Sequence, residues 1–245
     1  MDLSNKVCLV TGGARGIGRA IVEAYAAAGA ERVFAGDLAF DGFDEVEKQY
    51  PQTERLELNV TDAQSVDAAI NKVLDTTGRI DVLVNNAGIT RDGLVHKLSD
   101  DDWDAVVDVN MKGVFLMTRA VAPHMMEAGS GVVLNMASVV GLDGNIGQSN
   151  YAATKGGVVS MTKTWSKEFA RKGAEVRCNA IAPGFIRTPM TEKMPEKVLD
   201  MMVSKTTLAR IGEATDVANA ATFLASERAN FITGQVLRVD GGLVF

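Results

Sequence analysis

Tyr151 and Lys155 are the residues of this chain whose types and spacing could carry acid/base chemistry. If their segment is helical, side chains four positions apart lie on one face, roughly 5–6 Å apart at Cβ. A free phenol has a pKa of about 10, and a fixed cation beside it favours the phenolate and lowers that pKa. The spacing therefore predicts a proton donor and acceptor at Tyr151. An ordinary amphipathic helix would show the same spacing, so other motifs must decide between an acid/base pair and a helix without a catalytic role.

A glycine-rich turn near the N-terminus predicts a phosphate-binding site. The turn follows Lys6–Val10, an apolar run typical of a buried strand, and precedes Arg19–Gly29, an alanine-rich segment with helical periodicity. Its glycines are Gly12, Gly16 and Gly18. Glycines let backbone N–H groups approach a pyrophosphate, and the N-terminus of a helix adds partial positive charge.

An acidic residue after the next strand strengthens this interpretation. Arg32–Gly36 is a second apolar strand, and it ends in Asp37, nineteen residues after Gly18. A carboxylate about 20 residues past such a turn is where the adenosine ribose 2′-hydroxyl is bound. The three features together favour dinucleotide binding over a structural turn.

The motifs resemble those of the short-chain dehydrogenases/reductases, whose glycine turn has the same Gly-x-x-x-Gly-x-Gly form. Segments 88–92, 138–141 and 144–151 resemble the 3-oxoacyl-[acyl-carrier-protein] reductase branch of that family. The resemblance covers essentially the whole chain. The other residues that match the family in order and approximate spacing are Asn85, Asn86, Ala87, Gly88, Asn110, Ser138, Tyr151, Lys155, Pro183 and Gly184.

Strands and helices alternate along the chain, which predicts an α/β Rossmann-type fold: a doubly wound parallel sheet of about seven strands with helices on both faces. Strands are expected at 6–10, 32–36, 56–60, 80–84, 131–136, 176–181 and 236–239, and helices at 19–29, 63–77, 102–128 and 151–172. In such sheets ligands bind outside the carboxyl ends of the strands. The candidate residues that end a predicted strand, or lie just past one, are Gly12, Asp37, Asn59, Asn86, Ser138 and Pro183.

This arrangement predicts reduction of a carbonyl group. Tyr151 would give the proton in the reducing direction, and Ser138 would polarise the carbonyl oxygen and hold it in line with the phenol. Lys155 would lower the pKa of Tyr151 and, as the resemblance implies, bind the nicotinamide ribose hydroxyls. The resemblance also implies that Asn110 supports a water-linked proton path to the lysine, and the alternative is a buried helix kink satisfied by local hydrogen bonds.

The resemblance implies a set of cofactor contacts spread over the same edge of the sheet. They are Gly12, Arg15, Gly16, Ile17, Gly18, Asp37, Asn59, Val60, Asn86, Ala87, Gly88, Tyr151, Lys155, Pro183, Gly184, Ile186 and Thr188.

Asp37 favours NAD(H) over NADP(H), because the extra phosphate of NADP would bring negative charge close to its carboxylate. At about 4 Å and an effective dielectric of about 20, two like unit charges repel by about 4 kcal/mol. Arg15 argues against this preference, because it could hold that phosphate. It could instead pair with Asp37 or lie over the adenine. Many acyl-carrier-protein reductases use NADPH, and this chain departs from them at Asp37.

The expected substrate is a 3-oxoacyl thioester, carried by acyl carrier protein or by coenzyme A. A methionine-rich segment after Gly184 is expected to form a substrate lid at about 187–210, and its methionines suit an adaptable apolar surface. Arg171, Lys172 and Arg91 are candidates for meeting an acidic carrier protein. Two alternatives are an NAD-dependent dehydrogenase of a sugar, polyol or secondary alcohol, and a non-catalytic dinucleotide-sensing module.

Composition limits the other possibilities. With 245 residues and 47% hydrophobic content, we expect a single domain over 1–245. The net charge of −6 argues against nucleic acids and anionic membranes as partners. No apolar run is long enough to span a membrane, so a cytoplasmic protein is expected. No metal-ligand cluster is predicted, and Cys8 and Cys178 are interpreted as reduced core residues. Family resemblance and surplus apolar side chains on the helices at 102–128 and 151–172 predict a homotetramer.

Overall fold

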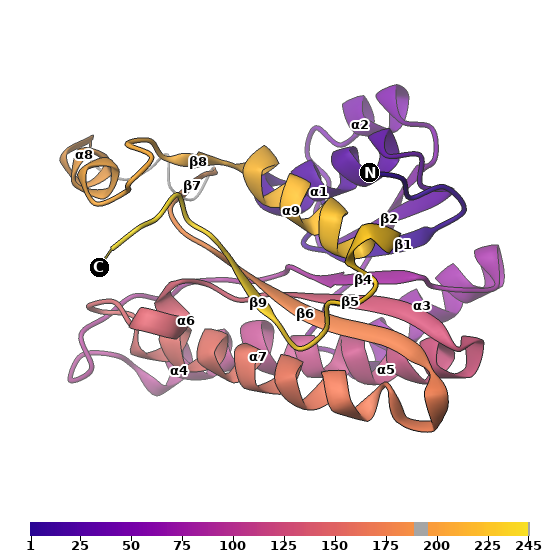
Figure 1. Cartoon of the computed structure of the whole chain (residues 1–245). Helices are drawn as coiled ribbons and strands as arrows, with labels where there is room; N and C mark the ends of the chain where they lie inside the picture. Colours follow the sequence, from indigo (N-terminus) through magenta and orange to yellow (C-terminus); the bar gives the residue numbers. More distant parts are fainter. Residues whose placement is uncertain (189–195, 245) are drawn as a thin grey trace.

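A seven-stranded sheet runs through the middle of the molecule in the computed structural model, which describes residues 1–188 and 196–244 (Figure 1). Its order is β3-β2-β1-β4-β5-β6-β9, and every neighbouring pair of strands is parallel. The predicted fold class is confirmed. The strands are β1 (Val7–Thr11), β2 (Arg32–Asp37), β3 (Thr53–Glu57), β4 (Val82–Asn85), β5 (Ser130–Met136), β6 (Glu175–Pro183) and β9 (Val236–Val239).

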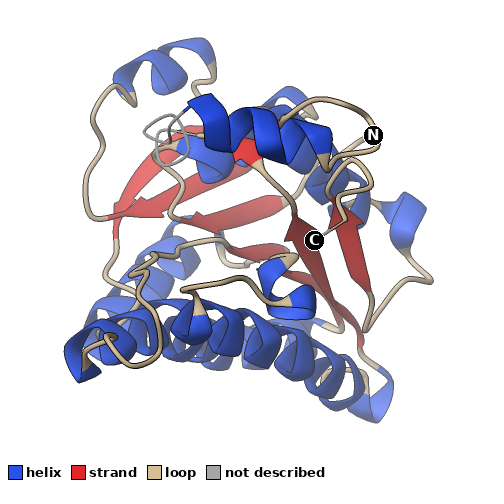
Figure 2. Ribbon diagram, turned by 90° about the vertical axis from the view of Figure 1, so that its left-hand side faces the viewer, coloured by secondary structure: helices blue, strands red, loops and turns tan. Residues whose placement is uncertain are grey.

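Helices cover both faces of this sheet, as Figures 1 and 2 show. On one face lie α1 (Gly16–Ala27) and α9 (Ala214–Ala225), and on the other lie α3 (Ala63–Thr77), α5 (Gly113–Ala128) and α7 (Ser149–Glu168). Successive side chains of β1 alternate between the two cores, because strand residues point to opposite faces in turn. Cys8 and Val10 pack with the α1/α9 layer, and Val7 and Leu9 with the opposite layer.

The strand order reverses between β1 and β4, since β2 and β3 extend to one side of β1 and the later strands to the other. Such a switch point leaves a crevice at the carboxyl ends of the strands, where open α/β sheets bind their ligands. The glycine turn follows β1, and Asn86–Gly88 follows β4. The sequence therefore placed both motifs correctly, on either side of the switch point.

Several predicted elements differ in their bounds, and three of them bear on the site. The third strand is Thr53–Glu57 rather than 56–60, because the chain leaves the sheet after Glu57 and Asn59 closes a local turn with Thr61. The helix predicted at 102–128 is divided into α4 (Asp100–Val107), a π-helical turn at Asp108–Lys112, and α5. The helix that carries Tyr151 starts at Ser149 and ends at Glu168, four residues earlier than predicted.

Several short elements were not predicted from the sequence. They are α2 (Asp44–Gln49), α6 (Val140–Asp143), the 3-10 turns Arg171–Gly173 and Glu227–Ala229, the strand pair β7 (Ile186–Arg187) and β8 (Gly212–Glu213), α8 (Glu196–Ser204) and α9. The predicted lid at 187–210 falls partly on 189–195, outside the described residues. Its described part contains α8, which lies apart from the main sheet beside β7 and β8 (Figure 1).

Among the described residues, no helix has both the length and the apolar character needed to cross a membrane. Residues 1–188 and 196–244 also contain no cluster of three or more His, Cys, Asp or Glu side chains that could hold a metal ion.

Candidate active site

The turn after β1 has a backbone conformation that requires glycine at three positions. Gly12 and Gly16 have φ of 62° and 55°, in the left-handed region that other residues rarely adopt. A Cβ on Gly18 would overlap the carbonyl oxygen of Gly12. The backbone therefore folds back on itself as tightly as the sequence predicted.

The helix that follows this turn keeps its N-terminal donors available. Arg15 is the N-cap of α1, yet no side chain of the described residues caps this helix end, and its first turn carries no acidic residue. In contrast, Asp62 caps α3 and Ser99 caps α4. Uncapped N–H groups at a glycine turn suit an anionic ligand such as a pyrophosphate, so these residues fit a dinucleotide.

Asp37 lies against the same turn. Its carboxylate accepts hydrogen bonds from the backbone N–H groups of Ala14, at 3.1 Å, and Leu38, at 2.8 Å. Each oxygen keeps a further lone pair for a ribose hydroxyl. The side chain of Arg15 is exposed, and in the part of the chain that the structure describes it forms no ion pair with Asp37. Pairing between these two residues, one of the three possibilities for Arg15, is therefore not observed.

Thr11 joins the two loops at the switch point, and sequence reasoning missed it. Its buried hydroxyl accepts from the backbone N–H groups of Asn86 and Ala87, both at 3.0 Å. The Asn86 side chain in turn donates to the carbonyl oxygens of Thr11 and Gly12, at 3.0 and 3.1 Å. The side-chain amide of Asn86 thus holds the glycine turn in place, and among the described residues its carbonyl oxygen accepts no hydrogen bond.

Ser138 and Tyr151 meet at the carboxyl edge of the sheet. Ser138 follows β5, is 8% exposed, and accepts from the N–H of Val140 at 3.1 Å. Burial raises the pKa of Tyr151 above its ordinary value, a hydrogen bond with Ser138 lowers it, and the charge of Asp92 raises it. The predicted lowering is therefore wrong in direction: desolvation of the phenol outweighs the effects that favour phenolate.

Lys155 is buried beside this pair, with its ammonium 5.6 Å from the centroid of the Tyr151 ring. Its Nζ donates to the carbonyl oxygen of Met136 at 2.6 Å. Burial lowers the pKa of Lys155 to about 8. The ammonium is thus held at the end of β5, on the tyrosine face of α7, as the spacing of the two residues predicted.

Asn110 lies in the π-helical turn and is completely buried. Its side chain accepts from the N–H of Ile89 at 2.8 Å and donates to the carbonyl oxygen of the same residue at 2.9 Å. The helix is therefore interrupted at Asn110, as the alternative interpretation held, but the partner is a distant loop. A Cβ built on Gly88 would lie 3.3 Å from Asn110 Oδ1 and 3.6 Å from Lys155 Nζ, which places Gly88 beside both side chains.

The other predicted cofactor contacts lie along the same edge. Ile17 is in the first turn of α1, and Val60 packs against Gly113. Asn59 uses its carbonyl oxygen locally, accepting from the N–H and hydroxyl of Thr61. Pro183 ends β6, Gly184 packs against Asp240, Ile186 is in β7, and Thr188 is the last residue described before 189.

Asn150, next to Tyr151, belongs to the segment 144–151 that resembles the family, and the structure shows what it contacts. Its side chain is completely buried and accepts from the N–H of Tyr151 at 2.7 Å. Its amide group donates to the carbonyl oxygens of Arg91, at 2.9 Å, and Asp102, at 3.3 Å. A buried asparagine at a helix start was the available signal, since buried amides require partners.

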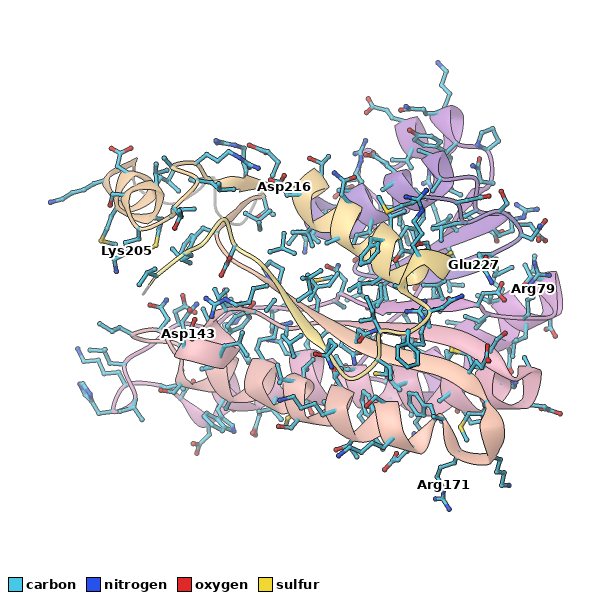
Figure 3. All side chains as sticks on the ribbon, in the orientation of Figure 1. Arg79, Asp143, Arg171, Lys205, Asp216 and Glu227 are labelled. Atoms are coloured by element: carbon cyan, nitrogen blue, oxygen red, sulfur yellow. The ribbon has the colours of Figure 1, made fainter. Side chains whose placement is uncertain are left out.

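The basic residues suggested for a carrier protein do not lie together. Arg91 lies close to the start of α7, because its carbonyl oxygen accepts a hydrogen bond from the Asn150 side chain. Its Nε is 3.8 Å from Oδ1 of Asp102. Arg171 follows the far end of α7, whose 20 residues span about 30 Å. Figure 3 shows Arg171 at one end of the molecule and Asp143 of α6 toward the other. Within one chain, Arg171 and Lys172 therefore lie far from Arg91, and their role toward a carrier protein stays a prediction.

Known proteins match this chain over its full length. Residues 12–244 match a family model described as enoyl-(acyl carrier protein) reductase. The 3-oxoacyl-[acyl-carrier-protein] reductase FabG of Thermotoga maritima is 49% identical, with 100% of each chain covered. The protein of the same name from Vibrio harveyi is 41% identical over 99% of each chain.

A solved structure agrees with the sequence relatives. The crystal structure of a protein named gox2181 superposes with a TM-score of 0.93 at 36% sequence identity, covering 98% of this chain and 96% of that one. The uncapped glycine turn, the paired Ser138 and Tyr151, and these similarities lead to one conclusion. The chain belongs to the short-chain dehydrogenase/reductase family, whose members are oxidoreductases that use a nicotinamide cofactor.

Proposed function

We propose that this chain reduces a 3-oxoacyl thioester to the 3-hydroxyacyl thioester. The observation that carries the proposal is the grouping of Ser138, Tyr151 and Lys155 at the edge that also holds the glycine turn. The Ser138 hydroxyl lowers the pKa of the phenol, and the Lys155 ammonium lies 5.6 Å from the centroid of the phenol ring. The curated relatives that cover the whole chain carry the name of this activity, which supports it further.

The residues divide the work of carbonyl reduction. Bound reduced nicotinamide supplies the hydride that the C3 carbon receives. Tyr151 gives its proton to the C3 oxygen as negative charge develops there, and Ser138 donates a hydrogen bond to the same oxygen. The raised pKa of Tyr151 keeps the phenol protonated at neutral pH, as a proton donor must be. Lys155 supplies positive charge beside the phenolate that remains.

Reduction of a 2-enoyl thioester is the second candidate, because the matching family model carries that description. In that reaction hydride also reaches C3, but negative charge develops on the thioester oxygen and the proton is added at C2. Ser138 and Tyr151 lie together and each carries a hydroxyl group, which suits a single oxygen that gains charge and then a proton. This geometry favours the 3-oxo substrate.

We propose NAD(H) as the cofactor. The carboxylate of Asp37 lies against the glycine turn, bonded to Ala14 N, where it would accept from ribose hydroxyls and repel a 2′-phosphate. Arg15 is exposed beside it, and it is the residue that would oppose this selection.

Steady-state oxidation of NADH tests the function. We expect turnover with acetoacetyl-acyl-carrier-protein and acetoacetyl-coenzyme A, and little with crotonyl-coenzyme A or with polyols and NAD+. Comparing KM for the two acetoacetyl thioesters decides which carrier presents the substrate. Faster reduction of crotonyl-coenzyme A would establish the enoyl alternative, and no turnover of either acetoacetyl substrate would remove the 3-oxoacyl assignment.

A further inference from the structure

The segment Ile89–Gly93, after β4, is fastened at one end to the π-helical turn. Ile89 forms both of its backbone hydrogen bonds with the side chain of Asn110, at 2.8 and 2.9 Å. This end of the segment is therefore held against the helix layer that also includes α5.

The other end is fastened to the start of α7 at three successive residues. Asn150 donates to the carbonyl oxygen of Arg91 at 2.9 Å. Gln148 Nε2 donates to both carboxylate oxygens of Asp92, at 3.1 and 3.2 Å. The N–H of Gly93 donates to the carbonyl oxygen of Gly147 at 2.8 Å. Of these links, only the second depends on a charged side chain.

Gln148 is the residue at which Asp92 can influence α7. It is the N-cap of that helix, its carbonyl oxygen accepts from the N–H of Ala152 at 2.7 Å, and its own side chain gives no capping bond. Its Oε1 accepts from the Asn145 side chain at 2.9 Å. Both polar atoms of the Gln148 amide group are therefore hydrogen-bonded, Oε1 to Asn145 and Nε2 to Asp92. Tyr151 lies three residues further on. Fixing Gln148 therefore fixes the first turn of the helix that carries the proton donor.

We propose that Asp92 is a positioning residue of this active site: its carboxylate fastens Gln148 at the start of α7 and places a negative charge toward the phenol of Tyr151. This inference rests on the proposed function for its role in turnover, but not for its effect on Tyr151. Asp92 touches no reacting atom itself.

The surroundings of Tyr151 make the charge of Asp92 matter. On the same helix, the ammonium of Lys155 lies 5.6 Å from the centroid of the Tyr151 ring. In the loop after β5, the hydroxyl of Ser138 lowers the pKa of the phenol. The side chains that pack against Tyr151 from α6 and the C-terminal segment are apolar: Val139, Val140 and Leu243. Asp92 supplies the charge of opposite sign to Lys155, and it favours the protonated phenol. Because Asp92 is exposed, salt should weaken its effect.

Titration of Tyr151 without any substrate tests the charge. The chain has three tyrosines, so [ζ-13C]tyrosine gives three resonances, and Tyr151→Phe identifies the relevant one. In Asp92→Asn the midpoint of the Tyr151 titration should fall by about half a pH unit or more at low salt, and by less in 1 M salt. Asp101→Asn is the matched control, because it removes the same charge from an exposed position in the first turn of α4. An unchanged midpoint in Asp92→Asn, or an equal fall in Asp101→Asn, overturns this half of the proposal.

Kinetics separate the hydrogen bond from the charge. Asp92→Asn keeps an oxygen that can accept from Gln148, whereas Asp92→Ala removes it. For acetoacetyl-coenzyme A at pH 7, kcat/KM should fall about tenfold in Asp92→Ala and less than about threefold in Asp92→Asn. Equal losses in the two variants would show that the link to Gln148 positions nothing. If the wild-type chain reduces no thioester, the proposed function fails, while the tyrosine titration still decides the effect of Asp92 on Tyr151.

Discussion

Lys155 is a charged group inside the protein, and its ammonium has a backbone carbonyl as hydrogen-bond partner. Burial lowers its pKa to about 8 from the ordinary 10.5. Between these two pH values the unfolded chain binds more protons at this site than the folded protein does, so the free energy of unfolding rises with pH. The folded protein therefore bears the cost of a buried ammonium at neutral pH, as expected of a lysine that serves the chemistry of the site.

Lys155→Met tests this at the level of stability. From pH 7 to pH 9.5 the wild-type protein should gain about 2 kcal/mol of unfolding free energy relative to the variant, because only the wild type loses the cost of a buried ammonium. Urea unfolding at both pH values, at one fixed protein concentration, measures the difference. A constant difference between the two proteins would show that Lys155 keeps an ordinary pKa.

Asp37→Ala tests cofactor selection. Removing the carboxylate should raise the ratio of kcat/KM for NADPH to that for NADH by tenfold or more, since like-charge repulsion of a few kcal/mol is lost. Arg15→Ala in the same background should then reduce the gain, if the exposed arginine holds the added phosphate. An unchanged ratio in Asp37→Ala would mean that the carboxylate is not the selector.

At the residue scale, the sequence predicted where the site residues lie in the fold better than it predicted which side chains surround them. Ser138, Tyr151 and Lys155 were predicted to meet because each has a fixed place relative to a strand end or a helix turn. The pKa direction of Tyr151 was wrong, because burial depends on which apolar side chains surround the phenol. These come from two segments far apart in the chain, Val139 and Val140 in one and Leu243 in the other. The contacts of Asp92 were missed for the same reason, since Gln148 is 56 positions away.

At the scale of elements, the π-helical turn is the feature that departs most from its predicted form. In a continuous helix over 102–128 the side chain of Asn110 would point in a different direction. In the wider π-helical turn it forms hydrogen bonds with both the N–H and the carbonyl oxygen of Ile89, as a neighbouring strand would. Periodicity could predict the helical segment but not the turn, because the turn is stabilised by hydrogen bonds with Ile89, 21 positions away in the chain. The distant backbone of Ile89 supplies the hydrogen bonds that the interruption needs.

Asn110→Ala should therefore lower the free energy of unfolding and slow the reduction of acetoacetyl-coenzyme A. The N–H and C=O groups of Ile89 lose their partners, at a cost of about 1–3 kcal/mol. Asn71→Ala, an exposed asparagine in α3, is the control for replacing asparagine by alanine within a helix. Urea unfolding and acetoacetyl-coenzyme A reduction measure both effects. Equal behaviour of the two variants would contradict a structural link between Asn110 and Ile89.

At the scale of the whole molecule, the parallel sheet explains why sequence motifs far apart come together. All seven strands point the same way, so residues that follow a strand share one edge wherever they occur in the chain. The small strand pair was not predicted, since its strands have two residues each and cannot show a period. The helices α8 and α9 were also not predicted, although both are amphipathic. Large apolar side chains remain exposed on the outer elements, among them Trp103 of α4, Phe115 of α5 and Leu237 of β9, at 38–42%.

The homotetramer expected from the sequence stays a prediction, and these exposed side chains are where it can be tested. Sedimentation velocity at micromolar concentration should give a species of four times the chain mass of 26.0 kDa. Phe115→Glu should reduce its size, because a buried unpaired carboxylate would be costly at a subunit contact. A monomeric wild-type protein at that concentration would contradict the expectation.

The most direct measurement of the proposed mechanism is reduction of acetoacetyl-coenzyme A by NADH in the wild-type protein and in Tyr151→Phe. Loss of the phenolic proton should lower kcat by a factor of 100 or more, about the contribution of a general acid. The Kd of NADH, measured by fluorescence without substrate, should change little. A Tyr151→Phe protein that turns over as fast as the wild type would show that the proton comes from elsewhere.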